Sequence, residues 1–191
     1  MSGICEREAA YESGFYRKRP IALVRGEGAR VWDAGGREYI DCIGGHGVAI
    51  VGHANPRVAE AISRQARRLL VCPGSFCNDV RAELLEELVG IAPPGIARAF
   101  LCNSGAEAVE AALKIARIVT GGTRFIAAAR GFHGRTLGAL SVTWRREYRE
   151  PFGPLLPGVT FVPYNDVAAL AKALAGGGVA GVILEVVQGE G

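Results

Sequence analysis

A short polar turn, Ser104-Gly105-Ala106, opens an alanine-rich stretch that extends to residue 120. The spacing of Ser104 and Glu107 fits a capping box, in which a hydroxyl and a carboxylate satisfy exposed N–H groups at a helix start. Capping does not explain Gly105, because glycine in the first turn costs up to about 1 kcal/mol relative to alanine. Free N–H groups and the helix dipole at such a turn bind phosphate, so capping and phosphate binding both stay open.

A loop with the sequence GFHGRT, residues 131–136, carries the second group of side chains suited to chemistry. Phe132 offers a flat aromatic surface between small neighbours, and Arg135 offers a fork-shaped guanidinium that binds carboxylate or phosphate. Each has an ordinary alternative, Phe132 in the core and Arg135 in solvent. Together with the turn at 104–106, they favour a planar phosphorylated cofactor and a carboxylate substrate.

Predicted strands and helices alternate through the second half of the chain and position both segments. Apolar strands are expected at 97–102, 123–129, 158–164 and 179–185, with helices at 104–120 and 166–176. This alternation is typical of an α/β fold with a mostly parallel sheet covered on both faces. Ligands of such sheets lie at the carboxyl ends of the strands, where both segments begin. Within the first helix, Glu110 and Lys114 are spaced to form an ion pair.

The first half of the chain is organised differently. Residues 21–41 read as short strands, with a hairpin turn at 33–36. A glycine-rich stretch follows, and Pro56 then opens a helix with Asn55 as its cap. A further helix begins at Asp79 and stops before a Pro-Pro-Gly sequence.

Composition excludes several classes of protein. The 191 residues are 49% hydrophobic, enough for a globular core, and the net charge of +3 is too weak to argue for nucleic-acid binding. No run approaches the ~18 apolar residues of a membrane helix, and the charged start lacks a signal peptide's apolar run. Five cysteines without paired CxxC spacing predict reduced thiols in a cytoplasmic protein and no metal site.

Several ordered motifs resemble class III pyridoxal-phosphate aminotransferases of the acetylornithine aminotransferase group: NSGAEAVEAALKIAR, GFHGRTLGALSVT, PLLPGVTFVPYND and VILEVVQGEG. Two others, ARVWDAGGREYIDCIGGHGVA and SVTWRREYREPF, resemble the archaeal and thermophile branch that acts in lysine and arginine biosynthesis on carrier-protein-bound substrates. The resemblance implies fold type I of the PLP-dependent transferases, aspartate aminotransferase-like, with three α/β/α layers. Residues 1–55 would then belong to the small domain and residues 56–191 to the first half of the large cofactor-binding domain.

The resemblance also implies a set of cofactor-binding residues. Ser104, Gly105 and Ala106 match the segment that holds the phosphate of pyridoxal 5'-phosphate. Phe132 matches the residue stacked on the pyridine ring, and His133 lies beside it. The remaining cofactor residue, Glu185, matches a carboxylate near the cofactor's hydroxyl.

Substrate-binding residues are implied in the same way. Arg135 matches the arginine that grips the substrate α-carboxylate. Glu190 matches an acidic switch that pairs with a downstream arginine and moves aside for a dicarboxylate. His46 falls at a substrate-facing position.

The catalytic lysine of the family has no match in this sequence. The three lysines, Lys18, Lys114 and Lys172, all lie outside the family's Schiff-base motif. The acidic residue that protonates the pyridine nitrogen also belongs to a motif beyond residue 191. We therefore expect a truncated chain, the N-terminal half of an aminotransferase, that is inactive by itself.

The predicted function is transfer of the amino group of glutamate to an N-acylated or carrier-bound semialdehyde, as in arginine or lysine biosynthesis. Expected partners are glutamate or 2-oxoglutarate, an acidic amino-group carrier protein and, at full length, a second copy of the chain. Arg145, Arg146 and Arg149 could steer the carrier or form a solvated basic face. The alternatives are a 4-aminobutyrate-type transaminase, an aminomutase of the same class, or an inactive truncated remnant.

Overall fold

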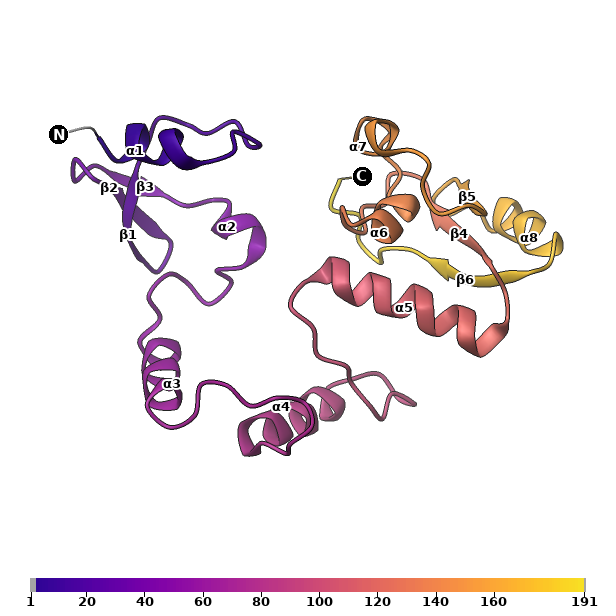
Figure 1. Cartoon of the computed structure of the whole chain (residues 1–191), viewed down its shortest axis with the longest axis horizontal. Coiled ribbons are helices and arrows are strands. Elements are labelled where there is room, and N and C mark those ends of the chain that lie inside the picture. The colour runs from indigo at the N-terminus through magenta and orange to yellow at the C-terminus, as the bar shows by residue number, and fades with distance from the viewer. Residues whose placement is uncertain (1–2, 191) are drawn as a thin grey trace. The chain divides into compact units, whose positions relative to one another are not determined.

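The computed structural model describes residues 3–190, and the chain divides into two compact units, one ending at Ala82 and the other beginning at Glu83 (Figure 1). The boundary lies within helix α4, Asp79–Gly90. The expected division at residue 55 concerns the domains of the resembled enzymes, and it stays a prediction.

In the first unit, helix α1 (Ile4–Tyr11) is followed by a small antiparallel sheet. Its strands occur in the order β1 (Leu23–Glu27), β2 (Arg30–Asp33), β3 (Glu38–Ile40). The Asp33 carboxylate accepts the backbone N–H groups of Gly35 and Arg37, both at 2.9 Å, and so closes the turn. The predicted hairpin at 33–36 is confirmed.

The glycine-rich stretch after β3 is held by an aspartate and a histidine. Asp41 Oδ1 accepts the N–H groups of Ile43 and Gly44 at 2.9 Å, and its Oδ2 lies 2.6 Å from His53 Nε2. The His53 hydrogen bond is the main reason that the pKa of Asp41 falls to about 2. The short helical turn α2 (Gly44–Gly47) begins at this anchor.

Two further helices, α3 and α4, follow along the chain. Helix α3 spans Pro56–Ala66, and Asn55 caps it as predicted, accepting the N–H groups of residues 57 and 58. Helix α4 begins at Asp79 as predicted. Asn78 Oδ1 accepts the N–H of Arg81 at 3.0 Å and supplies the cap.

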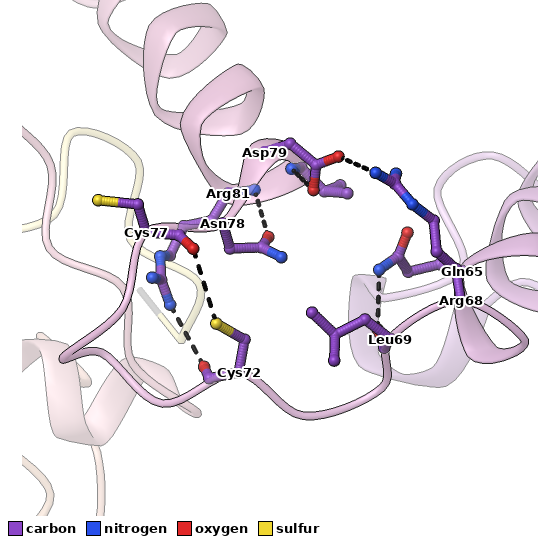
Figure 2. Close-up of polar contacts among 9 residues, drawn as sticks. Gln65, Arg68, Leu69, Cys72, Cys77, Asn78, Asp79 and Arg81 are labelled. Carbon is purple, nitrogen blue, oxygen red and sulfur yellow. Dashed lines mark hydrogen bonds and ion pairs between the residues drawn. The ribbon is translucent and has the colours of Figure 1, made fainter.

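The connection between α3 and α4 is fastened by side chains rather than by a regular element (Figure 2). Arg68 donates to Asp79 at the start of α4, and Arg81 donates to the carbonyl of Cys72 over 3.4 Å. The Cys77 thiol points away from the Cys72 thiol. No cluster of three or more His, Cys, Asp or Glu side chains suited to a metal occurs within the described residues.

A parallel sheet organises the second unit (Figure 1). Central strand β4 (Arg124–Ala128) pairs with β5 (Val159–Val162) on one edge and with β6 (Val179–Ile183) on the other. All pairings are parallel, so the sequence prediction of three of the strands and of their direction is confirmed.

Helices lie on both faces of this sheet. Phe125 and Ala127 face the core formed with Leu113 of α5 (Gly105–Thr120) and Val142 of α6 (Leu137–Val142). The opposite face, with Ala128 and Val182, borders a cavity of about 210 Å³ that is also lined by Leu170 of α8 (Val167–Ala175). The result is the predicted three-layer α/β/α order.

Two short elements lie between α6 and β5. They are α7 (Arg146–Arg149) and the 3₁₀ turn η1 (Glu150–Phe152). None of the helices within residues 3–190 is long and apolar enough to span a lipid bilayer.

The strand expected at 97–102 is the clear difference from the sequence prediction. This segment forms no strand, and Phe100 in it is 72% exposed. An apolar run becomes a strand only when another strand satisfies its N–H and C=O groups. Within the described residues, no strand pairs with this segment, since the sheet of the second unit contains only β5, β4 and β6.

Candidate functional site

The first turn of α5 is capped by its own side chains. Ser104 Oγ accepts the N–H of Glu107 at 3.2 Å, as predicted for the cap residue. The Glu107 carboxylate accepts the N–H of Asn103 at 2.5 Å, one residue before the position expected for a capping box. Capping therefore occupies the N–H groups of residues 103 and 107 only.

Gly105 and Ala106 keep their N–H groups available. No acceptor within residues 3–190 takes either of them. A Cβ added at Gly105 would meet no atom within 4 Å, and Gly105 does not require a positive φ. Neither backbone strain nor packing accounts for this glycine.

An open cavity of about 670 Å³ lies directly at this turn. It contains five of the residues predicted for the site together with three neighbours. The lining residues are Gly105, Ala106, Val109, Phe132, His133, Gly134, Arg135 and Thr136. The sequence prediction that the α5 turn and the loop 131–136 lie at one edge of the sheet is confirmed.

The loop that carries Phe132 is fixed by two backbone hydrogen bonds to side chains. The N–H of Phe132 donates to Glu185 Oε2 at 3.0 Å, and the N–H of His133 donates to Thr143 Oγ1 at 2.9 Å. Glu185 follows β6, so this bond joins the end of a neighbouring strand to the backbone of Phe132. Thr143 is fully buried and was not predicted from the sequence.

His133 is buried, and its Nε2 has no hydrogen-bond partner in the described part of the chain. Burial lowers the pKa of His133, and the Glu185 carboxylate opposes this effect.

Gly134 allows the loop to approach α5 closely. Its φ is +128°, and an added Cβ would lie 2.9 Å from the Cβ of Ala106 and 3.0 Å from that of Ala139. Any side chain here would push the loop away from the helix N-terminus.

Glu110 binds differently from the sequence expectation. Its carboxylate accepts hydrogen bonds from Thr136, Gly138 and Ala139, whereas a bond to Lys114 was expected. The spacing of Glu110 four residues after Ala106 was the available signal, because such residues share one helix face.

Glu190 lies at a neighbouring cavity of about 390 Å³, which Arg130, Trp144 and Arg145 also line. Its carboxylate is 3.5 Å from Arg145 Nε and accepts from the Tyr148 hydroxyl at 3.3 Å. The Tyr148 ring meets the Phe132 ring edge-on, with centroids 6.1 Å apart.

The other arginines predicted to form a basic face also have partners. Arg146 pairs with Glu150 in the next turn, and the Arg149 guanidinium lies 4.7 Å from the centroid of the Phe161 ring.

Lys114 and Lys172 belong to the second unit and do not line its cavity. His46 belongs to α2 in the first unit, where it is exposed, and its role stays a prediction. Lys18 pairs with Glu8 at 2.6 Å, Lys172 lies on α8, and Lys114 lies about 13 Å along α5 from Gly105 at the usual helical rise.

The cavity fits a planar phosphorylated group. Two available N–H groups at a helix N-terminus suit a phosphate. The Phe132 ring supplies an apolar wall, and Arg135 supplies a guanidinium on the same rim. Glu185 and Thr143 hold the loop 131–136 in place by accepting its backbone N–H groups.

Known proteins are similar in sequence to nearly the whole of this chain. A transaminase of [LysW]-aminoadipate semialdehyde from Deinococcus radiodurans is 52% identical over 96% of this chain and 43% of its own length. Acetylornithine aminotransferase of Methanopyrus kandleri is 50% identical over 94% of this chain and 46% of its own. The chain thus spans about half the length of the curated relatives it matches.

Solved structures agree with the sequence relatives. Ornithine aminotransferase from Toxoplasma gondii ME49 superposes with a TM-score of 0.89 at 35% identity, covering 97% of this chain and 45% of that one. The family description Aminotransferase class-III matches residues 13–191. The chain therefore belongs to the class III aminotransferases, which are pyridoxal-phosphate-dependent enzymes.

Proposed function

We propose that the protein carrying this sequence is a transaminase that moves the amino group of glutamate to an N-acylated or carrier-bound semialdehyde. The observation that supports it most is one cavity lined by Gly105 and Ala106, whose N–H groups are available, together with Phe132 and Arg135. The N–H groups suit the phosphate of the cofactor, and Phe132 suits its ring. Arg135 suits the carboxylate of the substrate. The relatives named for acetylornithine and for [LysW]-aminoadipate semialdehyde support the substrate class.

The residues divide the binding work between them. The N–H groups of Gly105 and Ala106, with the Ser104 hydroxyl, would hold the phosphate of pyridoxal phosphate. Phe132 would cover one face of the ring, with His133 beside it and Glu185 on the hydroxyl side. When bound, the cofactor supplies the electron sink that amino-group transfer needs.

Arg135 would orient the substrate. A guanidinium binds a carboxylate through two parallel hydrogen bonds, which fixes direction as well as charge. Glu190, predicted as the residue that yields to a dicarboxylate, lies at the adjoining cavity with Arg145. His46 is proposed as a further substrate-facing residue.

Partners and location follow from the same reasoning. An acidic carrier protein would present the semialdehyde in the manner that the name of the Deinococcus relative suggests. We infer a homodimer for the complete enzyme. We infer a cytoplasmic location from the five cysteines, an odd number without paired CxxC spacing.

The test is a half-reaction with glutamate. We expect the protein carrying this sequence to bind pyridoxal phosphate and to change its absorbance on addition of glutamate, with 4-aminobutyrate as the comparison donor. Arg135→Lys should lower the catalytic efficiency for glutamate by about tenfold, because lysine cannot replace a bidentate contact. Equal efficiency in the variant and the parent, or preference for 4-aminobutyrate, contradicts the proposal.

A further inference from the structure

The Glu110 carboxylate connects the helix that begins the site to the loop that completes it. Its Oε1 accepts the Thr136 hydroxyl at 2.6 Å and the N–H groups of Gly138 and Ala139 at 2.9 and 3.1 Å. These donors lie 26 to 29 positions further along the chain. One oxygen therefore joins α5 to the residues directly after Arg135.

Glu110 replaces the local cap of α6. Thr136 is the N-cap residue of α6, yet its side chain makes no capping hydrogen bond. The first N–H groups of a helix have no partner within the helix itself. Glu110 satisfies those of Gly138 and Ala139, and its negative charge lies at the positive end of α6.

The residues around this contact are tightly packed. An added Cβ at Gly138 would overlap the Glu110 carboxylate, and one at Gly134 would press against Ala106. Ala106 and Glu110 lie four residues apart, on one face of α5. That face therefore meets residues 134–139 at contact distance.

We propose that Glu110 is a positioning residue, which fixes the place of Arg135 relative to the available N–H groups of Gly105 and Ala106. The proposal rests on the proposed function, because it assigns those two places to a carboxylate and a phosphate. Arg135 lies one residue before Thr136, so the Glu110–Thr136 bond sets where its backbone lies. Without it, the two anion-binding groups would lose their fixed separation.

Glu110→Ala and Glu110→Gln test the link, with Lys114→Gln as a matched control on the same helix. Glutarate is the probe for the carboxylate site, and pyridoxal phosphate is titrated separately. We expect Glu110→Ala to weaken glutarate binding about tenfold, as small misplacements do, with pyridoxal-phosphate affinity nearly unchanged. The glutamine variant keeps an acceptor oxygen and should recover most of the loss. Equal weakening of both ligands, or none, overturns the proposal.

Hydrogen exchange in the protein without ligand separates this proposal from the proposed function. Glu110→Ala should speed exchange at residues 136–139 while the urea midpoint of unfolding stays close to that of Lys114→Gln. Faster exchange over the whole second unit would show a purely structural role and reject the proposal. If Glu110→Ala fails to fold, Thr136→Val removes a single bond and should still weaken glutarate binding. Failure to bind pyridoxal phosphate in the parent would reject the proposed function while the exchange result still tests the link.

Discussion

The backbone N–H of Phe132 donates to the carboxylate of Glu185 across 3.0 Å, although the residues lie 53 positions apart in the sequence. The bond runs from the loop after β4 to the segment after β6, so it holds the backbone of Phe132 against the end of a neighbouring strand. Glu185 Oε1 also accepts the N–H of Gly189 at 3.2 Å, which holds the segment leading to Glu190.

Glu185→Ala should loosen the cofactor through Phe132. The substitution leaves a partly buried N–H without a partner, at a cost of about 1–3 kcal/mol. We expect the dissociation constant for pyridoxal phosphate to rise about fivefold or more, measured by fluorescence titration. Glu185→Gln keeps an acceptor oxygen and serves as the control. Alanine and glutamine variants with equal affinity would contradict the positioning role of this bond.

Gly105→Val should affect the ligand and spare the fold. An added Cβ at Gly105 meets no protein atom, so the urea midpoint without cofactor should change only by the small difference in helix propensity. The branched side chain would block approach to the N–H groups of the first turn. We expect cofactor binding to weaken by well over about 1 kcal/mol, measured by equilibrium titration. Unchanged affinity would rule out a phosphate at this turn.

The sequence predicts elements whose signals are local. Asn55 and Ser104 each accept a backbone N–H at the helix start where the sequence predicts a cap, and Asp166 accepts one at the start of α8. The parallel sheet follows from the alternation of apolar strands with capped helices. The sequence alone therefore predicts that Gly105 and the loop after β4 lie at one edge of the sheet.

The sequence fails where a partner is distant along the chain. Residues 97–102 have a strand's composition, but strand formation depends on a pairing partner that composition does not reveal. Helix α6 has no cap within its own segment, because Glu110 of α5 accepts its first N–H groups. From the sequence alone, the spacing of Glu110 and Lys114 predicts an ion pair between them instead. The roles of Thr143 and Tyr148 depend in the same way on contacts from outside their own segments.

Asp41 should make the first unit sensitive to acid. Its folded pKa, about 2, lies below the ordinary value of 3.8, so the unfolded chain takes up the proton first. The stability that Asp41 contributes is complete above about pH 3.8 and is lost as the pH falls towards 2. Urea midpoints across this range should converge for the parent and Asp41→Asn. His53→Gln removes the largest cause of the lowered pKa and should move the loss to higher pH. A constant difference between the parent and Asp41→Asn would contradict the assignment.

Arg145 and Arg146 should steer an acidic carrier only weakly in the parent protein, because carboxylates neutralise both of them. Arg146 pairs with Glu150 and Arg145 with Glu190. Glu150→Gln removes one compensating charge from an exposed pair and leaves the cavity lining intact. We expect it to raise the association rate of an acidic carrier protein by about twofold at low salt, an advantage that fades as ionic strength rises. Stopped-flow association over a range of salt concentrations measures the effect, and Arg146→Gln should change the rate in the opposite direction. Rates that ignore both substitutions and the salt concentration would place the carrier on another face.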